Sequence, residues 1–152
     1  MSYRLLSATG ALAVSAFVAL PAYSQVKPDT QVRQRQAAMI LQGKYFYPIR
    51  NMAQGKMPYD AKIVARNVTY LDSLAQMPWD GFTPATKDIK SRSTPAVFSE
   101  PAKFKEAADR FMAEAAKLTD IARKGDEAAI RSQILAVDKT CNSCHENYRE
   151  RQ

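Results

Sequence analysis

The sequence predicts an all-α protein, an antiparallel four-helix bundle, and three observations lead to this fold. Apolar residues recur at steps of three and four along four segments, which is the spacing of one helix face. Two of the connections between these segments are short, so the helices that they join should run antiparallel. The one segment rich in β-branched residues, 64–70, lacks the alternating polarity of a half-buried strand.

Residues 1–24 have the pattern of a cleaved secretory signal peptide, and we expect the mature domain to span residues 25–152. A basic residue, Arg4, precedes 16 mainly apolar residues, and small residues precede a predicted cleavage between Ser24 and Gln25. An uncleaved anchor is the alternative. It is disfavoured because polar residues interrupt the apolar stretch, which is shorter than the ~20 residues that span a bilayer. We therefore expect a periplasmic protein whose mature chain does not insert into the membrane.

Charge and histidine content exclude several classes of function. The chain has 22 Lys and Arg against 15 Asp and Glu, a net charge of +7 that is spread along the sequence. We expect no nucleic-acid partner, whereas a basic surface can dock an acidic redox partner. A single histidine rules out metal sites with several imidazoles and catalysis by two histidines. We expect no enzymatic activity.

Capping residues delimit the first two predicted helices. Pro28 precedes Asp29 and Thr30, either of which can cap the first helix, and the segment 55–58 ends it. Asp60 can cap the second helix, which stops at Pro78. The expected apolar face of the first helix carries Ala38, Leu41, Tyr45, Ile49 and Met52.

A long loop separates these helices from the remaining two. No helical period survives from residue 77 to 99, and the aromatic residues within this loop predict that something large pins it. Ser99 is expected to cap the third helix, which Gly125 ends, and Asp126 to cap the fourth. The fourth helix carries an apolar stripe at steps of four and three that comprises Ile130, Ile134, Val137, Cys141, Cys144 and Tyr148.

The fourth stripe contains the sequence Cys141-Asn142-Ser143-Cys144-His145, a C-x-x-C-H motif. Covalent attachment of haem c needs two thiols for its vinyl groups and an imidazole for its iron, and on a helix these three side chains share one face. A disulfide one turn apart within a helix is strained, and a redox pair needs a helix N-terminus. A zinc site lacks further ligands. We predict one haem c per chain, bound to Cys141 and Cys144, with His145 as axial iron ligand, enclosed by the bundle near the C-terminus.

The chain resembles the cytochrome c prime family of exported four-helix haem proteins. The motif near the C-terminus is the specific part of this resemblance, which covers residues 28 to 150. Supporting stretches, in the order expected of the family, are Arg35 to Met39, Gly55 to Ala61, Met77 to Trp79, Glu100 to Phe104 and Cys141 to Arg149.

The resemblance implies roles for five further residues. Arg35 and Gln36 match first-helix residues beside the haem, where Arg35 would balance the charge of a propionate. Met39 matches the distal position that covers the open face of the iron, Arg149 a proximal arginine, and Thr94 a contact at the haem edge. In some relatives a first-helix methionine is the sixth ligand, so Met39 is either a ligand or an apolar cover.

Two functions follow from these expectations. The first is one-electron transfer with redox partner proteins, and the alternative is binding of nitric oxide or another small gas by a five-coordinate haem. The resemblance also implies a homodimer that pairs through the first two helices. Consecutive Tyr45, Phe46 and Tyr47 cannot all face one core, so at least one of them should point outward.

Overall fold

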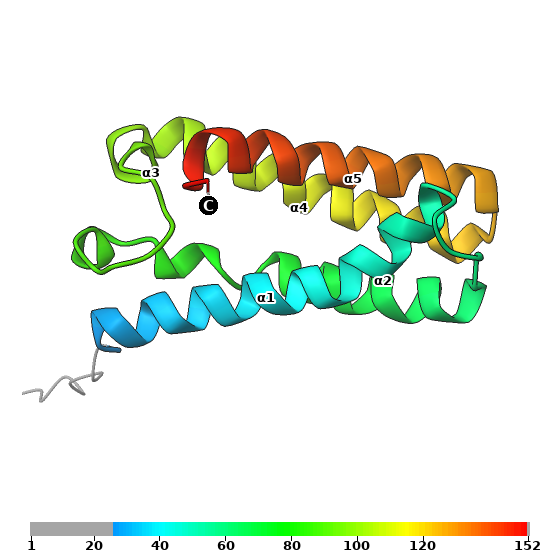
Figure 1. Ribbon diagram of the computed structural model, residues 1–152, viewed down its shortest axis with the longest axis horizontal. Coiled ribbons are helices and arrows are strands. Elements are labelled where there is room, and N and C mark those ends of the chain that lie inside the picture. Colours follow the sequence, from blue (N-terminus) through cyan, green and yellow to red (C-terminus); the bar gives the residue numbers. More distant parts are fainter. Residues whose placement is uncertain (1–25, 152) are drawn as a thin grey trace, which may run out of the picture.

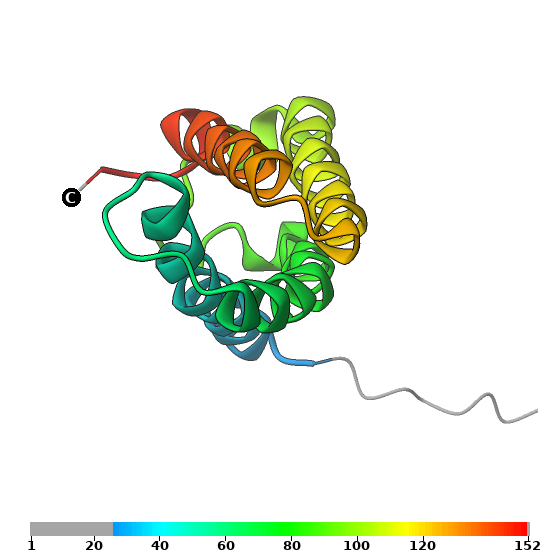
Figure 2. The same ribbon diagram turned by 90° about the vertical axis from the view of Figure 1, so that its right-hand side faces the viewer.

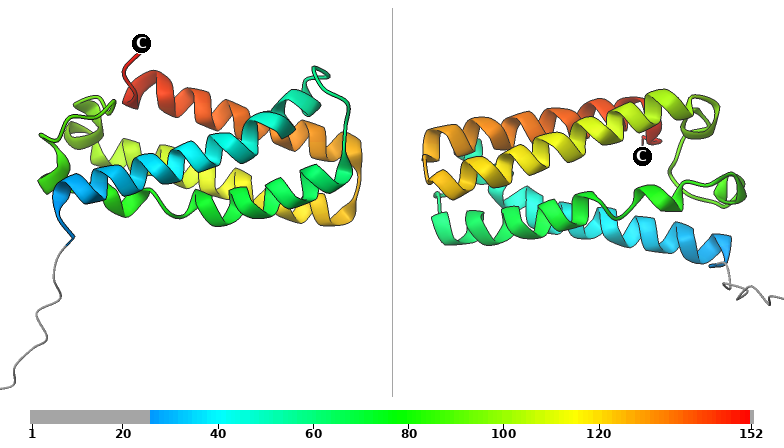
Figure 3. Two further views of the ribbon diagram at one scale, coloured as in Figure 1. Left: turned by 60° about the horizontal axis from the view of Figure 1, so that its bottom comes forward. Right: turned by 180° about the vertical axis from the view of Figure 1, so that it is seen from behind.

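The computed structural model describes residues 26–151 and confirms the predicted all-α four-helix bundle (Figures 1 and 2). The long helices are α1 (Pro28–Ala53), α2 (Ala61–Ala75), α4 (Pro101–Lys124) and α5 (Glu127–Tyr148). Consecutive long helices run in opposite directions, as the views from below and behind also show (Figure 3). Over residues 26–151 no β-strand forms, and the sole bridge pairs Ser93 with Arg149.

The predicted signal peptide, residues 1–24, lies outside the described residues, so its cleavage and the export that it implies stay predictions. Among residues 26–151, no helix combines the length and the apolar character that crossing a bilayer requires.

Three local signals read from the sequence are confirmed. The Asp60 carboxylate accepts hydrogen bonds from the backbone N–H groups of Lys62 and Ile63 at 2.9 and 3.0 Å. Asp126 does the same at the start of α5, at 3.0 and 3.2 Å. Each such cap stabilises its helix by about 1 kcal/mol. Gly125 ends α4 with a φ of 79°, a left-handed conformation that glycine adopts without strain.

Two other predicted caps are wrong. Lys27, not Asp29 or Thr30, is the N-cap residue of α1, and Glu100, not Ser99, is that of α4. In both helices a proline occupies the first position, where its fixed φ suits the helix and its missing N–H costs no hydrogen bond. Both helices therefore begin at a proline and have no side-chain cap, so their first residues differ from those that the capping preferences predict.

The connection between α2 and α4 is more ordered than the sequence predicts. It contains two 3₁₀ turns, η1 (Trp79–Gly81) and η2 (Pro84–Thr86), and the short helix α3 (Ala96–Ser99). Aromatic packing holds it to the bundle: the Trp79 ring lies 6.0 Å from that of Phe104 and 6.3 Å from that of Phe111, both on α4. The aromatic residues of this segment therefore pin it, as expected of apolar rings in a loop.

The main hydrophobic core occupies one end of the bundle. From α1 it takes Phe46, Ile49 and Met52, and from α5 it takes Ile130, Ile134 and Val137. Residues before Phe46 on α1 and after Val137 on α5 do not belong to this buried cluster. The ribbons of α1 and α5 approach each other at the core end and separate toward the N-terminus of α1 and the C-terminus of α5 (Figures 1 and 3). Side-chain packing thus differs between the two ends of the bundle.

Candidate cofactor site

Burial changes along the core-facing stripe of α5. Ile134 and Val137 are completely buried. Further along the same stripe, Cys141 and Cys144 are only half-buried, and His145 is exposed. Successive helix residues are about 100° apart, so these three side chains lie within about 100° of the helix circumference, around the direction of the core. Burial is therefore complete at Ile134 and Val137 and only partial at the C-x-x-C-H motif, although Cys141 still packs against the core.

The two thiols are free and protonated. Neither cysteine forms a disulfide. Burial, followed by the negative charge of Asp138, raises the pKa of Cys141 to about 12. Burial also raises the pKa of Cys144, against the influence of Arg110. A reactive thiol needs a lowered pKa, so this pair does not have the properties of a thioredoxin-type redox centre.

His145 is held in its neutral form. Although the residue as a whole is exposed, partial burial of its ring lowers the pKa, and the positive charges of Arg149 and Arg92 lower it further. The Arg149 backbone N–H also donates to the His145 carbonyl at 3.3 Å, so Arg149 lies beside the predicted axial ligand. A neutral imidazole has a free nitrogen lone pair, which is the form that binds iron.

The corresponding stripe of α1 carries Arg35 and Met39, one helical turn apart. Arg35 is 2% exposed. Met39 is half-buried and lies outside the main core, between Arg35 and the fully packed Phe46. Gln36 is exposed, about 100° around the helix from Arg35. The structure thus places Arg35 and Met39 on the inner face and Gln36 toward solvent.

Arg35 is a buried cation surrounded by neutral groups. Its Nη1 donates to the Gly81 carbonyl at 2.6 Å and to Thr86 Oγ1 at 3.0 Å. The guanidinium carbon lies 4.2 Å from the centre of the Phe82 ring. Over residues 26–151, no carboxylate forms an ion pair with Arg35, and desolvation lowers its pKa. A buried charge is costly without a counter-charge, so this site suits an anionic group such as a haem propionate.

The α2–α4 connection joins the two sides of this site. On the α5 side, Thr94 Oγ1 donates to the Asn147 carbonyl at 2.9 Å, and the Thr94 N–H donates to the Tyr148 carbonyl at 3.2 Å. Arg92 and Glu150 exchange a further pair of hydrogen bonds at 2.8 Å. Thr94 therefore fastens the loop to the end of the helix that carries the motif. The sequence did not reveal the loop partners of Arg35, because 46 or more residues separate them from it.

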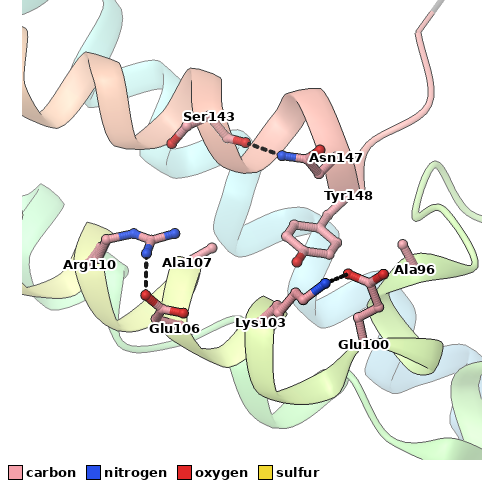
Figure 4. A pocket seen from close by; sticks show the side chains of 9 residues that line it. All are labelled: Ala96, Glu100, Lys103, Glu106, Ala107, Arg110, Ser143, Asn147 and Tyr148. Atoms are coloured by element: carbon pink, nitrogen blue, oxygen red, sulfur yellow. Dashed lines mark hydrogen bonds and ion pairs between the residues drawn. The ribbon is translucent and has the colours of Figure 1, made fainter.

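A surface cleft of about 400 Å³ lies against the outer side of the motif, between α4 and α5 (Figure 4). Its four charged side chains form two ion pairs, Glu106 with Arg110 at 2.5 Å and Glu100 with Lys103 at 3.3 Å. Ser143, Asn147 and Tyr148 form the α5 wall. Because the charges compensate one another within the cleft, it presents no net charge to a ligand.

The fold and the donor set define a class of protein. Two free thiols and an imidazole lie on the core-facing side of the last helix, and a buried cation lies on the first. These residues fit a covalently bound haem, which makes the protein a helical-bundle c-type cytochrome. The chain matches the model of the cytochrome c′ family over residues 30–149 and belongs to that family. Its cofactor is accordingly covalently bound haem c.

Relatives and solved structures agree with this assignment. The chain is 36% identical to cytochrome c′ of Rubrivivax gelatinosus, over 82% of this chain and 98% of that protein. A crystal structure of the R. gelatinosus protein superposes with a TM-score of 0.77 and covers 82% of this chain and 98% of its own. The nitric oxide complex of a variant of Alcaligenes xylosoxidans cytochrome c prime is 31% identical, with a TM-score of 0.77, over 84% of this chain and 99% of that one.

Proposed function

We propose that this protein is a periplasmic one-electron carrier whose haem c is bound through Cys141 and Cys144, with His145 as axial iron ligand. When bound, haem c supplies an iron that takes up and releases one electron. The main support for this function is that both thiols and the chain's one imidazole lie on the core-facing side of α5, beyond the fully buried part of its stripe.

Each surrounding residue has a role in this proposal. The protonated thiols of Cys141 and Cys144 are preserved for thioether formation, and the neutral ring of His145 presents a lone pair. Arg35 compensates the charge of a propionate inside the bundle. Because His145 is exposed, the attachment side lies close to the surface, where a redox partner can approach. The proposal describes a carrier and not an enzyme, since the chain's one histidine is used as an iron ligand.

Gas binding is the second candidate, and the nitric oxide complex of the A. xylosoxidans relative favours it. In this chain Met39 lies on the inner face of α1, one turn from Arg35, which suits a distal residue. As a ligand its thioether would close the site, and as an apolar cover it would admit only small molecules. Electron transfer is compatible with Met39 either as a ligand or as a cover, whereas gas binding needs an open coordination position on the iron.

Redox titration of the purified holoprotein, followed by its absorption spectrum, tests the proposal. We expect a reversible one-electron transition. Adding carbon monoxide to the ferrous protein then separates the two candidates, because an open site changes its spectrum rapidly and a closed site does not. A protein that contains haem but cannot be reduced and reoxidised reversibly would contradict the carrier function.

We also propose that the protein is exported and forms a homodimer through α1 and α2. These two helices carry large exposed apolar side chains, Ile40 at 70%, Tyr47 at 51% and Tyr70 at 45% exposure. Phe46 between the tyrosines is buried, so Tyr47 is the residue of the triplet that points outward. Burying such side chains against a second copy is favourable at about 25 cal/mol per Å².

A further inference from the structure

The side chain of Thr86 is the most completely bonded polar group around Arg35. Thr86 is fully buried, with 0% exposure, at the end of η2. Its Oγ1 accepts a hydrogen bond from Arg35 Nη1 at 3.0 Å and another from the Thr83 backbone N–H at 3.2 Å. Its single proton is within reach of the Thr83 carbonyl at 2.8 Å and the Gly81 carbonyl at 3.1 Å. A hydroxyl has one proton and two lone pairs, so all its bonding capacity is used.

The two terminal nitrogens of Arg35 are bonded unequally. Both N–H groups of Nη1 have short partners, Gly81 O at 2.6 Å and Thr86 Oγ1 at 3.0 Å. Within residues 26–151, the partners of Nη2 are the hydroxyls of Ser91 at 3.3 Å and Ser93 at 3.5 Å, which are at the limit of a hydrogen bond. One edge of the guanidinium is thus fixed, while the other retains capacity for a stronger acceptor.

We infer that Thr86 is the positioning residue of Arg35. It holds Nη1 and so directs the weakly bonded Nη2 edge toward the anionic group of the cofactor. The inference rests on the proposed function, in which Arg35 compensates a propionate. A valine at position 86 has a similar shape but cannot accept a hydrogen bond, which leaves a buried N–H of a cation without its partner.

A cation held beside the haem favours the reduced form, because reduction removes one positive charge from the iron. If the guanidinium is released from its position, the reduction potential should therefore fall. For one electron, a tenfold change in the equilibrium constant corresponds to 59 mV, so small displacements of the charge are measurable.

The test is a set of reduction potentials of the holoprotein, measured for Thr86→Val, Thr86→Ser, Arg35→Gln and the Arg35→Gln, Thr86→Val double variant. We expect the potential to fall in Thr86→Val and to remain at the wild-type value in Thr86→Ser, which keeps the hydroxyl. In the Arg35→Gln background, Thr86→Val should cause no further change. A purely structural role for Thr86 would instead shift the potential equally with and without Arg35.

Two results overturn the inference: a wild-type potential in Thr86→Val, or an equal shift in both backgrounds. Because valine at position 86 also removes the acceptor of the Thr83 N–H, the loss of stability from Thr86→Val is measured with and without Arg35. The loss must be smaller in the Arg35→Gln background, and an equal loss in both backgrounds also overturns the inference. A chain that carries no haem would refute the proposed function itself, whereas a haem-loaded protein whose potential ignores Thr86 refutes only the positioning role.

Discussion

Replacing Gly81 by alanine probes the contact between the α2–α4 connection and α1. A Cβ atom at position 81 would lie 3.0 Å from Arg35 Cβ and 3.1 Å from the Gln31 carbonyl oxygen. Both are well inside the 3.5–4.0 Å of an ordinary contact. The Gln31 carbonyl belongs to the helical backbone of α1 and cannot yield, so the connection must move away from the helix.

The cost has two parts. Forcing a methyl group into a packed site costs about 1–3 kcal/mol. Moving Gly81 also stretches the 2.6 Å hydrogen bond from Arg35 Nη1 to its carbonyl, and such bonds to charged groups contribute about 1.5–3 kcal/mol when intact. Alanine recovers about 0.4–1 kcal/mol through lower entropy of the unfolded chain. We expect a net loss of about 2 kcal/mol, which lowers Tm by about 8 °C for a domain of this size.

Urea and thermal unfolding of the holoprotein, followed by circular dichroism, measure this loss. The matched control is Gly43→Ala, within α1. Its Cβ would lie 3.0 Å from a ring carbon of Tyr47, but this side chain is 51% exposed and can turn away. Alanine in a helix interior is favoured over glycine by about 1 kcal/mol, so Gly43→Ala should be neutral or stabilising. A Gly81→Ala protein as stable as the wild type would show that the close approach of Gly81 to α1 does not limit the packing of the connection.

Three further predictions concern separate parts of the molecule. Met39→Ala should speed carbon monoxide binding to the ferrous protein. If the variant loses low-spin character, Met39 is an iron ligand, and if the spin state is unchanged, Met39 only covers the iron. A wild-type binding rate and spectrum would show that Met39 is not the distal residue. Ile40→Glu should shift the sedimentation coefficient toward that of the monomer. The control Leu135→Glu, at a 43% exposed site on α5, should not change it. A wild-type protein that sediments as a monomer would contradict the dimer. Burial and then Glu127 raise the pKa of Tyr59 above 10.0, so the unfolded chain ionises first as pH rises. The contribution of Tyr59 to stability should therefore be complete below pH 10 and be lost as the pH rises through the folded pKa. Tyr59→Phe should reduce the fall in stability over this range in urea titrations, and an identical decline in the variant would count against it.

Signals confined to a few neighbouring residues were readable from the sequence. The caps at Asp60 and Asp126 are predictable because each carboxylate bonds backbone N–H groups only two or three residues further along the chain. These hydrogen bonds do not depend on tertiary contacts. The stripe of α5 likewise follows from spacing alone, including the placement of both cysteines on the core-facing side. The caps assigned to Thr30 and Ser99 were wrong because a proline at the first helical position competes with them.

Contacts between segments that are distant in the sequence could not be predicted from it. The partners of Arg35 lie 46 to 58 residues away in a connection without helical period, and glycine and threonine there carry no signal of their own. Gln36, which the resemblance places beside the haem, is exposed and lies about 100° around the helix from Arg35, so its role stays a prediction. Long-range packing decides such positions, and no local spacing encodes it.

Covalent attachment of the haem is tested by the mass of the purified protein under denaturing conditions. We expect a chain of residues 25–152 that carries one haem, with the haem retained on the peptide that contains Cys141 and Cys144. Because thioether bonds survive unfolding, denaturation must not release the cofactor. A mature chain with two free thiols, or a haem that dissociates on denaturation, would contradict the claim.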